Sequence, residues 1–184
     1  MMGFDEVGVY GPDGVAAPRL AVRSESDGGG IDGVDGDVDL AIVTYGNGVV
    51  TALQAQRELE ELARASGGAA ERKNVVIVDC PLLSDVPAEL PRALRGARSV
   101  LFADICKEGA APLTTHVAKL QAMGALPASW LALTAPKTYN PLGNVTTFLN
   151  VDDVTAGARA LLARGAPKCS LCGEEGHNKR TCPQ

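Results

Sequence analysis

Apolar residues follow two alternating patterns along the middle of this chain. Short apolar runs of five or six residues alternate with stretches in which apolar residues recur every three or four positions. The short runs are typical of strands covered on both faces, and the longer stretches of amphipathic helices. The clearest pair begins at residues 40–45, LAIVTY, turns at Gly46-Asn47-Gly48, and continues as a helical stretch that ends near Ala65.

The same alternation repeats three more times. Further strands are predicted at residues 74–79, 99–104 and 129–133, and helices at residues 88–94, from Pro112 onward, and after a cap at Asp152 or Asp153. Strands that alternate with helices predict an α/β domain whose mainly parallel, open sheet has helices on both faces. We expect four to five strands in one domain that covers residues 39–163.

The segments at the two ends have a different composition. Residues 1–38 are rich in glycine and aspartate, and a segment that buries so little apolar surface is expected to be a flexible arm. Its alternating aspartates, at 32, 35, 37 and 39, resemble a calcium loop, but no glutamate stands at the closing position. A solvated linker is therefore the favoured interpretation. Residues 164–184 form a separate small module.

Length and charge narrow the function classes. With 184 residues, 46% of them apolar, the chain has room for one α/β domain and a small module. A formal net charge of -5 argues against a general nucleic-acid binder. No apolar run approaches the roughly 18 residues of a membrane span, and the acidic N-terminus, MMGFDE, has no signal-peptide or transit-peptide pattern. No membrane partner is expected.

The five cysteines divide into two groups. Cys80 and Cys106 stand alone, whereas three cysteines lie within the last sixteen residues. This distribution favours a reducing compartment and a metal site over a disulfide framework. It is consistent with the cytoplasm or the nucleus.

No catalytic site can be assigned to the α/β domain from its sequence. The turn after the first strand lacks both the spaced triple glycine of a dinucleotide site and the lysine of a phosphate loop, so a structural turn is favoured. His116 is expected to be a surface or hydrogen-bonded histidine rather than a catalytic base. Cys80 and Cys106 both follow strand ends, where open α/β sheets bind ligands, and Lys107 could lower the thiolate pKa of Cys106. Without a histidine partner, a nucleophilic role for Cys106 is disfavoured.

Residues 37–163 resemble a known family. The segments DVDLAIVTYGNGVVTALQAQRELEE, NVVIVDCPLLSDVPAELPRAL, SVLFADICKEG, KTYNPLG and VDDVTAGARALL follow one another as in the transketolase C-terminal domain. The form found in the beta subunit of thiamine-diphosphate-dependent 2-oxo-acid dehydrogenases is the most similar. Asp39–Gly46, Asp79–Asp85 and Pro136–Gly143 match the family's motifs in order.

The resemblance implies a dimerisation and docking domain. In that family two other domains hold the cofactor, and the preceding domain contributes the glutamate that activates its aminopyrimidine ring. Here a glycine–aspartate arm precedes the domain, and CKEGAAPLTTHV replaces the family's glycine-rich segment after the third strand. No catalytic residue carries over, so the resemblance leaves it open whether the chain belongs to an enzyme. The resemblance also makes the mitochondrion a candidate compartment.

The C-terminal tail contains the strongest chemical pattern in the chain. Residues 169–182 have the spacing C-x2-C-x4-H-x4-C, and the expected ligands of one structural zinc ion are Cys169, Cys172, His177 and Cys182. Three thiolates and one imidazole complete a tetrahedral zinc shell. Gly173 and Gly176 supply unhindered backbone within this tight loop. Because so short a segment cannot build a core, zinc binding would provide its folding energy.

The tail resembles the CCHC zinc knuckle, especially the knuckles of plant-type transposases and transcription factors. Such knuckles commonly bind single-stranded nucleic acid by stacking bases on aromatic residues and by contacting phosphates. This knuckle has no aromatic residue, and its cations, Lys168, Lys179 and Arg180, are offset by Glu174 and Glu175. Tight sequence-specific binding is therefore not expected, and weak nucleic-acid contact and protein contact remain equally open.

Two functions follow from the sequence. The first is a non-catalytic, zinc-binding module that contacts nucleic acid or a protein through its knuckle and forms homo- or hetero-oligomers through its α/β domain. The alternative is a fragment or subunit of a thiamine-diphosphate-dependent 2-oxo-acid dehydrogenase whose catalytic domains lie elsewhere. An independent cysteine-dependent enzyme ranks last.

Overall fold

A five-stranded sheet forms the centre of the part of the chain that the structure describes. The computed structural model describes residues 5–11, 21–22, 26, 30–31, 38–65, 73–138 and 148–164. The strands are β1 (Gly8–Tyr10), β2 (Leu40–Thr44), β3 (Val75–Asp79), β4 (Ser99–Lys107) and β5 (Ser129–Ala135). Their order in the sheet is β1-β3-β2-β4-β5, and all neighbours are parallel except β1 and β3. The predicted α/β fold with a mainly parallel sheet is confirmed.

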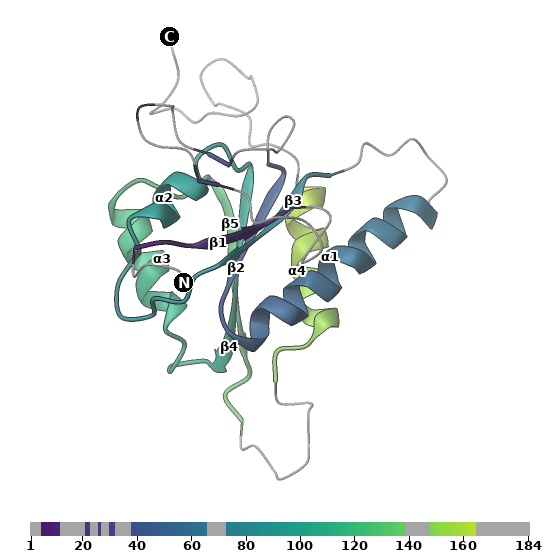
Figure 1. Ribbon diagram of the computed structural model, residues 1–184. Coiled ribbons are helices and arrows are strands. Elements are labelled where there is room, and N and C mark those ends of the chain that lie inside the picture. The colour runs from purple at the N-terminus through teal and green to yellow at the C-terminus, as the bar shows by residue number, and fades with distance from the viewer. Residues whose placement is uncertain are drawn as a thin grey trace.

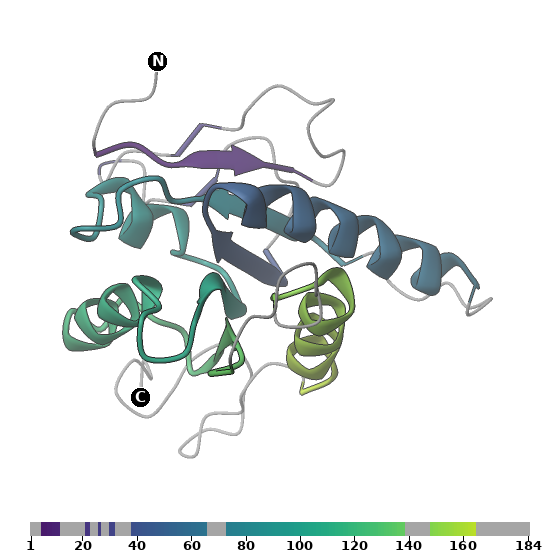
Figure 2. The ribbon, with the colours of Figure 1, turned by 90° about the horizontal axis from the view of Figure 1, so that it is seen from below.

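Helices cover both faces of this sheet. Figure 1 shows α2 (Glu89–Ala93) and α3 (Leu113–Ala122) on one face, and α1 (Asn47–Ala65) and α4 (Val151–Ala163) on the other. In the view from below, β1 lies at one edge of the sheet and β5 at the other, and the C-terminal half of α1 projects past the sheet (Figure 2). Among the described residues, no helix is both long and apolar enough to cross a bilayer.

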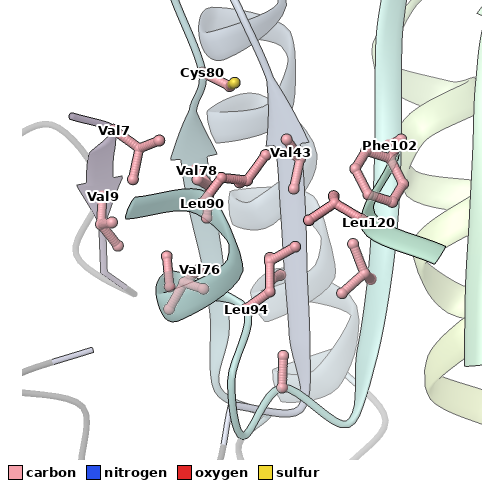
Figure 3. Packing of buried hydrophobic residues seen from close by; sticks show 14 of the residues in the cluster. Val7, Val9, Val43, Val76, Val78, Cys80, Leu90, Leu94, Phe102 and Leu120 are labelled. Atoms are coloured by element: carbon pink, nitrogen blue, oxygen red, sulfur yellow. The ribbon is translucent and has the colours of Figure 1, made fainter. Parts of the chain in front are cut away.

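The sheet separates two apolar layers. In the first, Val43, Phe102 and Leu120 pack with residues of α2 such as Leu90 (Figure 3). The second lies between the sheet and the pair α1 and α4, with Ile42 at its centre. Strand β2 is fully buried because both of its faces and both of its edges are covered. The strand that is clearest in the sequence is therefore also the centre of the fold.

Strand β1 lies within the segment that was predicted to be a flexible arm. Its three residues pair antiparallel with β3, and Val9 is fully buried. The buried Gln56 amide of α1 donates hydrogen bonds to the carbonyls of Gly11, at 3.1 Å, and Val75, at 2.7 Å. The sequence analysis missed β1 because three residues are too few to produce a recognisable alternation among glycines and aspartates. For residues 8–10 the flexible-arm prediction is wrong.

The cap of α4 also differs from the predicted one. Asn150 is the N-cap residue: its side chain accepts from the Asp153 N–H at 2.9 Å, and the Asp153 carboxylate accepts from the Asn150 N–H at 3.1 Å. This reciprocal pair is a capping box, which satisfies backbone donors at the helix start. The prediction of Asp152 or Asp153 as the cap was wrong because asparagine, three residues before Asp153, caps equally well.

The two glycines of the first turn have different roles. Gly46 has φ of +54°, which is the left-handed conformation that the sharp turn requires. Gly48 instead lies inside α1, where a Cβ atom would stand 2.1 Å from Thr44 Oγ1 and 2.9 Å from Ile105 Cγ2. The second glycine therefore lets the helix approach the ends of β2 and β4 closely.

Candidate functional site

The carboxyl ends of β2, β3 and β4 meet at one edge of the sheet, where α/β proteins commonly bind ligands. Asp104 is the buried centre of the polar groups there. Its carboxylate accepts from the Tyr45 hydroxyl at 2.7 Å, from the Cys106 N–H at 2.9 Å and from the Leu113 N–H at 2.8 Å. Because Leu113 is the first residue of α3, this carboxylate fixes the start of that helix to the end of β4.

Tyr45 connects this carboxylate to a half-buried thiol. The tyrosine hydroxyl also lies 3.2 Å from Cys106 Sγ. Burial, the hydrogen bonds to Cys106 and Asp104, and the Asp104 charge raise the pKa of Tyr45 above its usual value. Tyr45 therefore stays a neutral hydrogen-bond donor. The Lys107 ammonium group, expected beside Cys106, donates to the Thr138 carbonyl.

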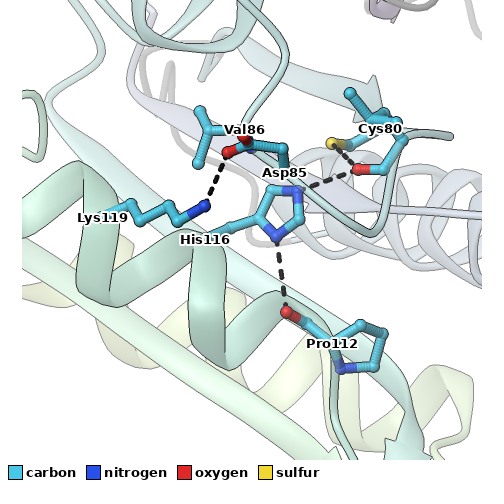
Figure 4. Close-up of polar contacts among 7 residues, drawn as sticks. Cys80, Asp85, Val86, Pro112, His116 and Lys119 are labelled. Carbon is cyan, nitrogen blue, oxygen red and sulfur yellow. Dashed lines mark hydrogen bonds and ion pairs between the residues drawn. The ribbon is translucent and has the colours of Figure 1, made fainter.

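The loop after β3 packs against α3 through His116. This histidine is fully buried, and its Nε2 lies 2.9 Å from the Leu82 carbonyl while its Nδ1 lies 3.4 Å from the Pro112 carbonyl (Figure 4). Both ring nitrogens thus face backbone oxygens. Of the two roles expected from sequence, a surface or a hydrogen-bonded histidine, this geometry fits the second.

The same carbonyl serves the second cysteine. Cys80 is fully buried, and its Sγ lies 3.7 Å from the Leu82 oxygen. Burial, together with the charge of Asp79, raises the pKa of Cys80 to about 12. A thiolate is the reactive form of cysteine, so this group is a poor nucleophile near neutral pH. The outer rim of the loop carries an exposed ion pair in which Lys119 Nζ lies 2.7 Å from Asp85 Oδ1, and it lowers the pKa of Asp85.

The polar side chains at this edge therefore already have partners within the same chain. The Asp104 carboxylate receives three donors, both nitrogens of His116 face carbonyls, and the Cys80 thiol stays protonated. This arrangement joins three strand ends to α3. Sequence reasoning missed Asp104 as its centre, although an aspartate that ends a buried strand at the ligand-binding edge could have identified it.

A groove of about 510 Å³ lies at the opposite end of α1. Leu59 and Leu162 supply its apolar walls. Lys73 lies in the segment that leads into β3, and Val75 is the first residue of that strand. Its charged lining residues are Glu60, Arg64, Lys73 and Arg159. Glu60 pairs with Arg64 at 2.9 Å. The groove thus combines apolar side chains with an excess of positive charge, on a chain whose net charge is negative.

The predicted zinc ligands and the cations beside them lie in residues 165–184, outside the described part of the chain. They are Cys169, Cys172, His177 and Cys182, together with Lys168, Lys179 and Arg180. Within the described residues, no three histidine, cysteine or acidic side chains are grouped closely enough to hold a metal ion. The zinc site therefore remains a prediction from spacing.

Comparisons with known proteins bear on the fold. No protein-family model and no curated protein matches this sequence. Among solved structures, the chain is similar to "Split gene transketolase, inactive beta4 tetramer", with a TM-score of 0.51 and 17% sequence identity. The similarity covers 69% of this chain and 40% of that one. It supports a transketolase-like fold for the α/β domain, as the sequence resemblance implied.

Proposed function

We propose that this protein is a zinc-binding, non-catalytic docking module. The observation that carries this proposal is the internal use of the polar groups at the carboxyl edge of the sheet, where an enzyme of this fold class would expose reactive groups. The Asp104 carboxylate and the His116 ring connect the protein's own elements. Holding elements together, rather than reacting with a substrate, is the role that these contacts support.

The α/β domain is the platform for assembly. Its cationic groove suits an acidic partner that has apolar side chains, since Arg64, Lys73 and Arg159 accompany Leu59 and Leu162. The similar split-gene transketolase is described as a tetramer, which supports assembly through a domain of this fold. Docking of another chain to this domain is therefore the first half of the proposed function.

The zinc knuckle provides the second half of the proposed function. Cys169, Cys172, His177 and Cys182 would hold one structural zinc ion. Zinc would order the tail, so that Lys168, Lys179 and Arg180 contact single-stranded nucleic acid or an acidic protein surface.

The salt dependence of nucleic-acid binding tests the proposed contact between the knuckle and single strands. The probes are fluorescent single-stranded RNA and DNA, and the anisotropy titration is repeated at increasing salt. Changing Lys179 and Arg180 to alanine should weaken binding and reduce the salt slope by roughly 1.4, because each phosphate contact on a single strand contributes about 0.7. The matched control changes Arg57 and Lys137, two exposed cations outside the tail, to alanine.

Equal effects of the two pairs of substitutions would contradict a nucleic-acid contact by the knuckle. Absence of binding to both probes would assign the knuckle to protein contact. In either case the zinc content of the chain is measured separately, so that the metal site and its partner are tested independently.

A second candidate is a subunit of a divided thiamine-diphosphate-dependent enzyme, such as a 2-oxo-acid dehydrogenase. The likeness to a split-gene transketolase favours it, since that enzyme is also encoded in separate pieces. Co-purification tests this candidate: a stable complex of this chain with a separate thiamine-diphosphate-binding chain would support a subunit. A cofactor-binding domain encoded upstream of Met1 in the same reading frame would instead make the chain a fragment of such an enzyme, and the absence of both would support the docking module.

A further inference from the structure

The two edges of the sheet differ in length and chemistry. Strand β1 ends one edge with three residues, and such short edge strands resist pairing with other chains. Strand β5 ends the other with seven residues, SWLALTA, none of them charged. In the described part of the chain, β4 is the one strand that pairs with β5. An edge strand that is long, uncharged and free of proline is a template for a further strand.

The middle of β5 is also open to solvent. Ala132 is exposed, and the apolar side chains beside it, Trp130, Leu131 and Leu133, are each half-buried. Leu131 and Leu133 extend the apolar layer beneath α1 and α4, whereas Trp130 extends the layer beneath α2 and α3. Both layers of the core thus end at an uncovered apolar border along this strand.

The register of β5 shows which backbone groups face outward. The Ala135 carbonyl accepts from the Glu108 N–H at 2.9 Å on the β4 side. Because the N–H and C=O groups of one residue point to the same side and alternate along a strand, those of Trp130, Ala132 and Thr134 point away from β4. Ala132 is the central residue of the strand, with three residues on either side.

We propose that β5 pairs antiparallel with β5 of a second copy of this chain, about a twofold axis at Ala132. This pairing rests on the docking role proposed above and adds to the groove a second surface, through which the α/β domain binds its own copy. Ala132 then lies opposite its own copy as a hydrogen-bonded pair, and Trp130 lies opposite Thr134. On the other face Leu131 lies opposite Leu133, so both apolar layers continue across the axis.

The charges around the strand support a second copy as the occupant. The seven paired residues bring no like charges together, and Lys137 would lie opposite Pro127. Pro127 and Pro136 flank the strand and limit the ladder to these residues, because proline cannot donate to it. Because the ladder is limited to seven residues, we expect a weak dimer whose population rises with protein concentration.

Charge exchange at Ala132 tests the position of the axis. Sedimentation velocity is measured over a concentration series for the full chain and for Ala132→Lys and Ala132→Glu. Each variant places two like charges opposite each other and should weaken dimerisation by a factor of up to about five. An equimolar mixture of the two variants should restore dimerisation, because lysine then faces glutamate. Val50→Lys, which also places a charge at an exposed position but on α1, should leave dimerisation unaltered.

Hydrogen exchange of the unmodified chain provides a second readout that needs no variant. Protection of the amides of Trp130, Ala132 and Thr134 should rise with protein concentration and persist when a chelator removes zinc. A chain that is monomeric at every concentration would overturn the proposal, as would a dimer that both charge variants leave unchanged. Protection of these amides that is the same at every protein concentration would assign the edge to an occupant other than a second copy, which also overturns self-pairing.

Discussion

Individual residues in this domain take their roles from distant neighbours. Gly46 could be assigned from sequence because a turn after a buried strand needs a residue that tolerates positive φ, and its φ of +54° meets that need. Gly48 could not, since its role depends on Ile105, which comes from β4. Asp104 could have been singled out by its position at the end of the predicted strand 99–104, but its donors Tyr45 and Leu113 could not, because they come from other elements.

Gly48→Ala tests the close approach of α1 to the sheet. A Cβ atom would stand 2.1 Å from Thr44 Oγ1, so the substitution should lower the free energy of unfolding by about 1–3 kcal/mol, despite alanine's better helix propensity. Chemical denaturation measures the change. Combining Gly48→Ala with Thr44→Ala should recover part of the loss, and strictly additive effects would contradict the proposed contact.

Cys80 provides a pH-dependent test of burial. Its pKa is raised to about 12 in the folded state, whereas an exposed thiol has a pKa of about 8.5. Above pH 9 the unfolded chain therefore releases a proton that the folded chain keeps, so this group lowers stability by about 1.4 kcal/mol per pH unit up to about pH 12. Denaturation between pH 8 and 10 should show a shallower loss for Cys80→Ala than for wild type. Equal slopes would contradict burial of a protonated thiol.

Most elements could be predicted from sequence because their apolar patterns are long enough to identify. The pattern at residues 40–45 predicted β2, and the helical spacing after it predicted α1. Strand β1 escaped prediction because it owes its structure to pairing with β3 and to the Gln56 amide. Elements of this kind depend on contacts that no local pattern contains.

The capping box at the start of α4 can be tested by substitution. Asn150→Ala removes the acceptor for the Asp153 N–H and half of the capping box, so it should lower the free energy of unfolding by about 1 kcal/mol. Asp152→Ala serves as the control, because this acid interacts with the helix dipole but does not form the box; its effect should be smaller. Thermal and chemical denaturation measure both. A larger loss for Asp152→Ala would contradict the assigned cap.

At the scale of the whole molecule, a domain with two apolar layers is joined to a tail whose sequence carries different chemistry, a cluster of cysteines and one histidine. At the carboxyl edge of the sheet, Asp104 and His116 bind other elements of the same chain, and in the proposed function the surfaces of the domain serve assembly. The four expected zinc ligands can be proposed from spacing because a metal site of this size is local in sequence. Binding partners cannot be proposed in this way, since recognition depends on surfaces that distant segments build.

The zinc content of the purified full-length chain tests the central claim most directly. Elemental analysis should find about one zinc ion per chain, and the double variant Cys172→Ser, His177→Ala should lose it. Cys106→Ser, which changes a thiol outside the knuckle, should retain it. A chain without zinc, or equal zinc in the ligand variant and wild type, would contradict the account.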